Sequence, residues 1–171
     1  NGSESIFWSF QTMYPPLSFG KNNPQNPGIN QPTSLLLSWS YSSGASSYEY
    51  CYDTTNNGLC DDDSWHPVGQ NTSVSISNLN TSTNYYWQVR AINIGGTTYA
   101  NAGSWWSFQT VPPPPTNFNK NAPSNSQINV PLALTLSWEG SDGASGYEYC
   151  YDITNDNACS TWVPTTFTSV N

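Results

Sequence analysis

The four cysteines are the residues of this sequence best placed to do chemistry, because they form two pairs of identical spacing. Cys51 and Cys60 are nine positions apart, and Cys150 and Cys159 repeat that spacing 99 positions later. Four cysteines allow three pairings, and the repetition favours the two local ones, each clipping a hairpin. One zinc site built from all four is the alternative, but its ligands would come from two copies of the repeat. Two disulfides imply an oxidising compartment, so we expect an extracellular or cell-surface protein.

Carboxylates cluster densely at one place, where Asp61, Asp62 and Asp63 are consecutive. Calcium prefers such oxygen ligands. The second copy has Ser160 and Thr161 there, and consecutive acids in a loop are usually solvated, so no metal is the favoured interpretation and calcium the alternative. The single histidine, His66, is interpreted as a loop side chain. We expect no catalytic residue, no cofactor and no enzyme, because no nucleophile–base pair or phosphate-binding glycine loop is present.

The two lysines occupy equivalent positions, Lys21 and Lys120, and each precedes an asparagine. Some bacterial surface domains of related sandwich type join lysine to asparagine in an isopeptide bond, a reaction that needs a buried acid. No acid is predicted to point inward here. Both lysines are therefore predicted to be exposed.

The elements that position these residues come from a repeated block, because residues 35–60 return as residues 134–159. Leu35, Leu37 and Trp39 alternate with polar or outward residues, and the tyrosines of YEYCY (residues 48–52) do the same. A period of two predicts two neighbouring strands. We expect Trp39 and the tyrosines to be buried, and Glu49, Cys51 and Asp53 to lie on the outer face.

Composition indicates a soluble all-β protein whose core is aromatic. Hydrophobic residues make up 36% of the sequence, aromatic residues 15% and charged residues only 8%. The net charge is −8 with three basic residues, which disfavours nucleic acid and anionic membranes as partners. No apolar stretch approaches the length of a membrane span, so membrane insertion of this segment is not expected.

The repeat predicts three regions. Residues 5–12 match residues 103–110, so residues 1–12 are predicted to be the last strand of a preceding repeat. Residues 13–110 form one complete domain, and residues 111–171 form a domain lacking its final strands. Pro112 to Pro115 predict a short, stiff polyproline II spacer between the two domains.

Residues 78–96 carry the most informative pattern. Leu79 lies six residues before Tyr85, and residues 85–93 read YYWQVRAIN. Together with Trp39 and Tyr48, this pattern resembles the fibronectin type III family, in particular its bacterial cell-surface versions. The resemblance implies tandem immunoglobulin-like β-sandwiches, the terminal ones incomplete. It predicts one core made of Trp39, Tyr48, Tyr50, Tyr85, Trp87, Trp106 and Phe108, with Tyr86, Gln88 and Arg90 facing outward. The family's Arg-Gly-Asp loop is absent, which excludes integrin-type binding.

The outer face is the candidate ligand surface. Glu49, Tyr86, Arg90 and Trp105 are expected to meet there, with Arg90 stacked on Trp105 and paired with Glu49. The favoured interpretation is that these side chains pair only with one another on the surface of the sheet. The alternative is that they form a platform that binds glycans or another partner. Asn71 and Asn80 begin Asn-Thr-Ser sequons and are candidate glycosylation sites, although sequons occur here no more often than chance predicts.

We expect a structural segment of an extracellular fibre, stalk or surface filament built from tandem disulfide-clipped repeats. The alternative is an adhesin, or a carbohydrate-binding or spacer module of a secreted polysaccharide-active enzyme. The expected partner is the protein itself, either as a continuous chain, which we favour, or head to tail through Ile6, Trp8 and Phe10 as an assembly strand.

Overall fold

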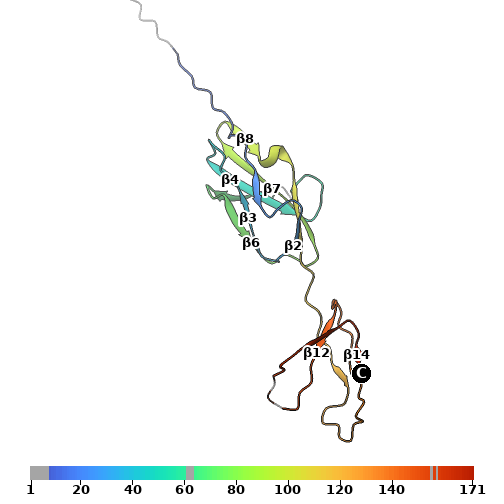
Figure 1. The fold of residues 1–171 in the computed structure, drawn as a ribbon. Helices are drawn as coiled ribbons and strands as arrows, with labels where there is room; N and C mark the ends of the chain where they lie inside the picture. Colours follow the sequence, from blue (N-terminus) through green and yellow to red (C-terminus); the bar gives the residue numbers. More distant parts are fainter. Residues whose placement is uncertain (1–7, 61–63, 155, 157) are drawn as a thin grey trace, which may run out of the picture. The chain divides into compact units, whose positions relative to one another are not determined.

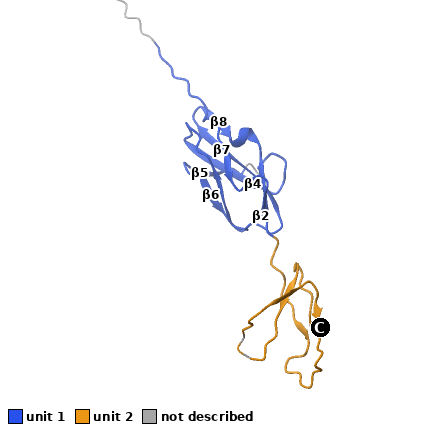
Figure 2. Ribbon diagram, viewed as in Figure 1, with its two compact units in different colours: residues 1–111 blue, residues 112–171 orange. Residues whose placement is uncertain are grey.

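The computed structural model describes residues 8–60, 64–154, 156 and 158–171, and it is built from β-strands (Figure 1). The chain separates into two compact units, residues 1–111 and residues 112–171 (Figure 2). The strands of unit 1 are β1 Lys21–Asn23, β2 Gly28–Gln31, β3 Leu35–Trp39, β4 Ser47–Asp53, β5 His66–Gly69, β6 Ser73–Ile76, β7 Asn84–Asn93, β8 Gly96–Tyr99 and β9 Trp106–Thr110. Those of unit 2 are β10 Lys120–Ala122, β11 Leu136–Trp138, β12 Tyr147–Tyr149, β13 Val163–Thr165 and β14 Ser169–Val170.

Unit 1 is a sandwich of two sheets. One sheet has the order β1-β3-β6, and the other has the order β2-β9-β7-β4-β5, with β8 also paired to β7. All of these pairings are antiparallel except that of β2 with β9, which is parallel. Two largely antiparallel sheets packed over a core of alternating inward residues form the immunoglobulin-like architecture to which fibronectin type III domains belong.

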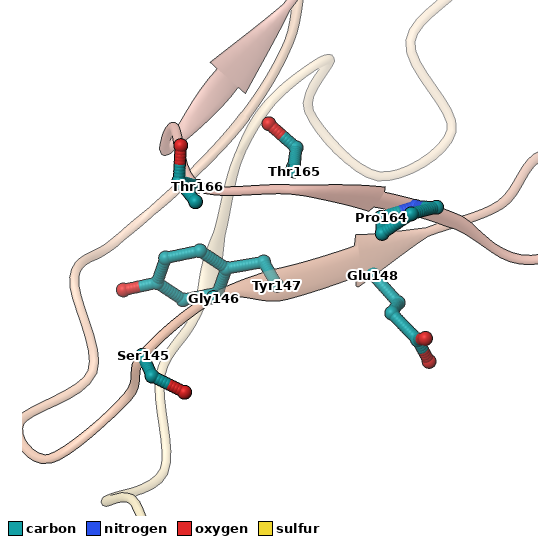
Figure 3. A pocket seen from close by; sticks show the side chains of 7 residues that line it. All are labelled: Ser145, Gly146, Tyr147, Glu148, Pro164, Thr165 and Thr166. Carbon is teal, nitrogen blue, oxygen red and sulfur yellow. The ribbon is translucent and has the colours of Figure 1, made fainter.

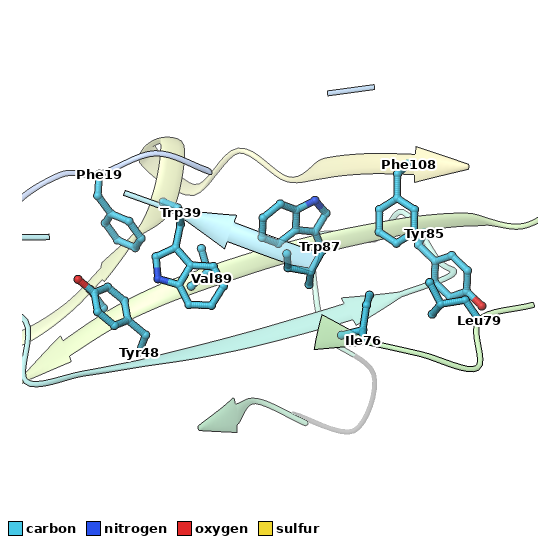
Figure 4. Close-up of a cluster of buried hydrophobic side chains, with 12 residues drawn as sticks. Phe19, Trp39, Tyr48, Ile76, Leu79, Tyr85, Trp87, Val89 and Phe108 are labelled. Carbon is cyan, nitrogen blue, oxygen red and sulfur yellow. The ribbon is translucent and has the colours of Figure 1, made fainter. Parts of the chain in front are cut away.

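The core lies between the sheets and is dominated by aromatic rings (Figure 4). The inward facing predicted for Tyr85 and Trp87 of β7 is confirmed, because both are buried, as are Val89 and Ala91 on the same face. Ring pairs join the elements: Phe19 meets Tyr48 edge-on at 5.7 Å, and Tyr85 stacks on Phe108 at 5.4 Å. The buried members of the core are Phe19, Leu37, Trp39, Tyr48, Ile76, Leu79, Tyr85, Trp87, Val89, Ala91, Ala100 and Phe108. The predicted core members Tyr50 and Trp106 are half-buried and pack against this cluster.

The chain turns a corner before β7, where the sequence places Leu79 six residues before Tyr85. The backbone N–H of Asn80 donates a hydrogen bond of 2.9 Å to the hydroxyl of Tyr85, and Leu79 is buried beside it. Thr110 closes the same corner from β9, because its hydroxyl donates to the carbonyl of Asn80. The end of the last strand of unit 1 is therefore tied to the start of β7.

The ladder along one edge of β7 has a gap. β9 pairs with residues Asn84 to Trp87 of β7, whereas β8 pairs with residues Arg90 to Asn93. Between them the chain passes through a short 3-10 segment, η2 Ala100–Gly103, in which Asn101 and Ala102 have φ of 52°. Gln88 and Val89 are thus left without a strand neighbour on that side. None of the helical segments in the described residues is long and apolar enough to cross a bilayer.

Unit 2 repeats part of this architecture. Its sheet β10-β11-β14 corresponds to β1-β3-β6, and its two-stranded sheet β12-β13 corresponds to β4-β5. The registers also correspond, since Lys21 pairs with Trp39 and Lys120 pairs with Trp138. The described residues of unit 2 contain no counterpart of β7, β8 or β9.

Each end of the segment between the units is hydrogen-bonded to its own unit. The N–H of Val111 donates to the carbonyl of Gln31 at 2.9 Å, and the N–H of Ser82 donates to the carbonyl of Val111 at 3.0 Å. In unit 2, the N–H of Thr116 donates to the carbonyl of Asp142 at 3.0 Å. The stretch between these anchors is Pro112 to Pro115, whose rings fix φ and favour an extended chain.

Candidate functional site

The cysteines form two local disulfides. Cys51 is bonded to Cys60 with their Cα atoms 6.1 Å apart, and Cys150 is bonded to Cys159 with their Cα atoms 6.3 Å apart. In unit 1 the bond joins β4 to the segment that leads into β5. This is the hairpin clip that the repeated spacing predicts, and it is present in both units.

The outer face of β4 differs from the prediction in its exposure. Glu49, Cys51 and Asp53 do alternate with the tyrosines, but Cys51 and Asp53 are buried. In the loop closed by the disulfide, a Cβ placed on Gly58 would lie 3.9 Å from Nε1 of Trp105, so this loop lies beside Trp105.

Arg90 and Glu49 are paired on this face, as expected from their positions on β7 and β4. Nη2 of Arg90 lies 2.6 Å from Oε2 of Glu49, and Nε donates to the same oxygen at 2.8 Å. The predicted stacking partner was wrong. The guanidinium lies over the ring of Trp65, 4.2 Å from its centroid, rather than over Trp105. Trp65 in turn packs edge-on against Tyr99 at 5.9 Å.

The Arg90 cluster consists of Glu49, Trp65, Arg90 and Tyr99, and its members contact one another. Partial burial alone would lower the pKa of Arg90, but hydrogen bonds to Glu49 and Tyr99 outweigh it, so that the guanidinium pKa lies above its ordinary value. The charge is neutralised by Glu49 and the stacking face of the guanidinium is occupied by an indole. The arrangement joins β4, the segment before β5, β7 and β8. Tyr86, the remaining member of the predicted ligand face, is half-buried on β7 outside this cluster.

Lys21 contradicts the prediction of an exposed side chain. Only 4% of the residue is exposed, whereas its counterpart Lys120 is exposed as predicted. The Nζ atom of Lys21 donates to Oε1 of Gln88 at 2.8 Å and to the carbonyl of Ser104 at 2.6 Å. It also lies 5.5 Å from the ring centroid of Trp87 and 5.7 Å from that of Trp106.

The outward assignment of Gln88 was also wrong, because 1% of this residue is exposed. Its Oε1 accepts from the N–H of Val89 at 2.9 Å, and its Nε2 donates to the carbonyl of Ser104 at 3.0 Å. Gln88 and Lys21 thus fill the gap that the diverging strands β8 and β9 leave along β7. They satisfy backbone groups that a strand would otherwise pair.

Burial governs the electrostatics of Lys21. Removal of the amine from water lowers its pKa from 10.5 to about 7. Among the described residues, the ion pair of Arg90 with Glu49 is the one salt bridge, so no carboxylate compensates the lysine. A sequence signal for this site exists: Lys21 is two residues after the inward-facing Phe19, which is the spacing of residues on one face of a strand.

The remaining candidates are dispersed. Asp61, Asp62, Asp63 and Ile6 lie outside the described residues. Trp8 and Phe10 are almost fully exposed, and they precede the first strand of unit 1. Asn71 and Asn80 are exposed in the turns before β6 and β7, so both sequons are accessible. No group of three or more potential metal ligands occurs within the part of the chain that the structure describes.

Unit 2 contains a shallow pocket of about 650 Å³ over its two-stranded sheet (Figure 3). Tyr147, Glu148, Pro164, Thr165 and Thr166 line it, together with Ser145 and Gly146. Glu148 is the equivalent of Glu49 but points away from the ring of Tyr147 in the view of Figure 3. One carboxylate beside hydroxyl groups forms no recognisable catalytic arrangement.

No protein-family model and no curated protein matches this chain. Solved structures are similar to it: FN3tt at 20% identity and a TM-score of 0.36, covering 56% of this chain and 92% of that one. An Fn3-like protein from Clostridium thermocellum is similar at 19% identity and a TM-score of 0.37, covering 56% and 90%. The FN1–FN3 domains of chicken CNTN1 are similar at 16% identity and a TM-score of 0.40, covering 92% of this chain and 57% of that one.

At such identities a likeness concerns the fold alone. The strand order, the antiparallel ladders and the aromatic core described above establish that fold independently. The chain consists of tandem fibronectin type III-like β-sandwich units, of which unit 1 contains both complete sheets.

Proposed function

We propose that this chain is a structural segment of an extracellular fibre, stalk or surface filament. Tandem disulfide-clipped sandwiches follow one another along one continuous polypeptide and interact with further repeats of the same kind. The observation that carries this proposal is the duplication of a half-sandwich, strand for strand and disulfide for disulfide, on either side of a proline spacer.

The ends of the spacer support a mechanical role. Val111 is held to unit 1 by Gln31 and Ser82, and Thr116 is held to unit 2 by Asp142. Only Pro112 to Pro115 lie between these anchors, and a proline run is a semi-rigid spacer. A pull on the chain would therefore be transmitted into the hydrogen-bonded ends of each unit instead of extending a long flexible linker.

The disulfides support the extracellular location. Each closes a loop with a sequence separation of 9. Such bonds form and persist in oxidising environments. They also shield the enclosed loop from extension when the remainder of a domain is unfolded.

The experiment that tests this function is a binding screen of the full chain against immobilised glycans and polysaccharides. A structural segment gives no saturable binding, because Arg90 is already engaged by Glu49, Tyr99 and Trp65. The matched controls are Arg90→Ala and Trp65→Ala in the same chain. Saturable binding by the wild-type chain that either substitution abolishes would replace the structural role with a carbohydrate-binding one.

A further inference from the structure

The loop closed by the disulfide of unit 1 contains two neighbouring residues that can react with each other. The sequence has two Asn-Gly pairs, and of these Asn57–Gly58 lies in the part of the chain that the structure describes. Both residues are exposed. The side-chain amide of an asparagine is an electrophile, and the backbone nitrogen of the next residue is the nucleophile nearest to it along the chain. Ring closure between them is intramolecular, so it is favoured wherever the fold holds the two groups together.

A turn holds the side chain of Asn57 in this position. Its Oδ1 accepts a hydrogen bond of 2.8 Å from the backbone N–H of Leu59, two residues further on. Such an Asx turn folds the side-chain carbonyl back over the backbone that follows it. The hydrogen bond polarises the amide carbonyl, and the nitrogen of Gly58 lies between the two residues that the bond joins.

The nitrogen of Gly58 is open to this reaction. Glycine has no Cβ, so no side chain of its own crowds the nitrogen. Its φ is 73°, a conformation that residues with a Cβ adopt at a cost. Apart from the chain neighbours of Gly58, the one described atom within 4 Å of a Cβ built there is Nε1 of Trp105, at 3.9 Å. Little in the loop therefore hinders formation of a five-membered ring.

Unit 2 shows that the same turn accommodates a carboxylate. Asp156 stands at the position equivalent to Asn57. Its Oδ1 accepts a hydrogen bond of 3.0 Å from the backbone N–H of Ala158, which is the turn that Asn57 makes with Leu59. Replacement of the amide of Asn57 by a carboxylate is therefore compatible with this loop.

We propose that Asn57 is a site of spontaneous covalent modification, at which the chain converts its own asparagine to aspartate and isoaspartate through a cyclic succinimide. The nitrogen of Gly58 loses its proton to hydroxide and bonds to Cγ of Asn57. The bond from Cγ to Nδ2 breaks, and Nδ2 takes up a proton from water and leaves as ammonia. One water molecule then opens the ring. Attack at Cγ gives aspartate, and attack at the main-chain carbonyl carbon gives isoaspartate, whose backbone runs through Cγ.

The two products affect the loop differently. Aspartate adds one negative charge and keeps the turn, as Asp156 does. Isoaspartate also adds one carbon to the backbone of a loop whose ends are joined by a disulfide with Cα atoms 6.1 Å apart. It removes the side-chain acceptor of the Leu59 N–H, and we expect it to move Gly58 relative to the indole of Trp105.

The test incubates the full 171-residue chain, with its disulfides intact, in mildly alkaline buffer and follows each asparagine by peptide mapping and mass spectrometry. A mass gain of about 1 Da is expected at Asn57, with part of the product open to methylation by an isoaspartate-specific methyltransferase. Asn121, which is exposed and precedes Ala122 on β10, is the internal control. Conversion of Asn57 is expected to be at least about ten-fold faster than that of Asn121, because glycine leaves the nucleophile uncrowded.

Two variants separate the reaction from the fold of the loop. Gly58→Ala is expected to slow conversion of Asn57 at least about ten-fold, because the added Cβ crowds the nitrogen. The NMR signal of the Trp105 indole N–H reports whether this variant keeps the loop folded. Asn57→Asp gives the position of that signal for the aspartyl product, and the isoaspartyl product is expected to shift it away from that position.

Conversion of Asn57 no faster than that of Asn121 would overturn the inference. A product without isoaspartate would also overturn it, because direct hydrolysis of the side chain yields aspartate alone. A folded Gly58→Ala chain that converts as fast as the wild-type chain would exclude the nitrogen of residue 58 as the nucleophile.

Discussion

The lysines of the two units show how much a buried site depends on a distant part of the same domain. Lys21 and Lys120 follow equivalent phenylalanines and pair with equivalent tryptophans. Lys21 is buried among Gln88, Ser104 and two indole rings, and Lys120 is exposed. The difference is the segment from β7 to β9, which lies 63 or more positions further along the chain than Lys21. Local sequence fixes the strand and its facing, and the later hairpin decides whether that face is buried.

The largest expected effect that tests this comparison is the loss of the central tryptophan. Trp39→Ala removes a ring that is 2% exposed and enclosed by both sheets. It is expected to lower the free energy of unfolding of unit 1 by about 3 to 5 kcal/mol. Trp138→Ala in unit 2 is expected to lower it by less than half as much, because the described residues of unit 2 include no counterpart of β7 or β9 to pack against that ring. Urea unfolding followed by NMR signals of each unit measures both losses. Equal losses would contradict the dependence of the tryptophan's contribution on β7 and β9.

The second effect is a pH dependence confined to unit 1. The pKa of Lys21 is about 7 when folded and 10.5 in its ordinary state. Below pH 7 both states bind the proton, and the site adds no pH dependence. Between pH 7 and 10.5 the unfolded chain binds more protons than the folded one, so stability rises with pH.

Lys21→Met is the matched variant for this pH dependence, because it keeps the bulk of the side chain and removes the amine. From pH 7 to pH 9 the wild-type unit is expected to gain about 2 to 3 kcal/mol relative to this variant. Lys120→Met is the control and is expected to change nothing over the same range. Urea titrations at a series of pH values provide the measurement. An equal pH dependence in wild type and Lys21→Met would show that the amine is not held neutral by burial.

Sequence reasoning found the strands, the core facing and the disulfide pairs, because these follow from a period of two and from repetition. It missed the burial of Lys21 and Gln88 because lysine and glutamine are usually exposed. The two lie 67 positions apart, and the need to bring them together arises only from the gap between β8 and β9. It named Trp105 as the stacking partner of Arg90, whereas the structure has Trp65, because a sequence does not indicate how the segment leading into β5 packs against β7.

The third expected effect is the difference in stability lost when the disulfide of each unit is removed. Replacing both Cys51 and Cys60 with serine is expected to destabilise unit 1 by about 2.5 kcal/mol through the freed loop of the unfolded chain. Both cysteines are buried in unit 1, whereas those of unit 2 are half-buried, so lost packing adds to the loss in unit 1 alone. The matched variant replaces Cys150 and Cys159. A larger loss from the unit 2 pair than from the unit 1 pair would contradict the contribution assigned to the buried packing of Cys51 and Cys60.

The smallest expected effect comes from the Arg90 cluster, which unit 2 lacks. Glu49→Gln weakens a partly exposed ion pair and is expected to cost unit 1 about 0.5 to 1 kcal/mol, an effect that added salt reduces. Glu148→Gln in unit 2 is expected to have no measurable effect. Thermal unfolding at low and high salt compares the two variants. A larger loss from Glu148→Gln would reveal a cation partner in unit 2 that the structure does not show.

The central claim, that the chain is a structural tandem segment, is tested most directly by stretching single molecules of the full chain from its two ends. Unit 1 is expected to unfold in one force peak, with the loop between Cys51 and Cys60 shielded. Reduction of the disulfide is expected to lengthen that step by about 25 Å, because a separation of 9 residues then extends at about 3.5 Å per residue from a starting span of 6.1 Å. Extension of unit 1 without any force peak, or a step length unchanged by reduction, would contradict the account.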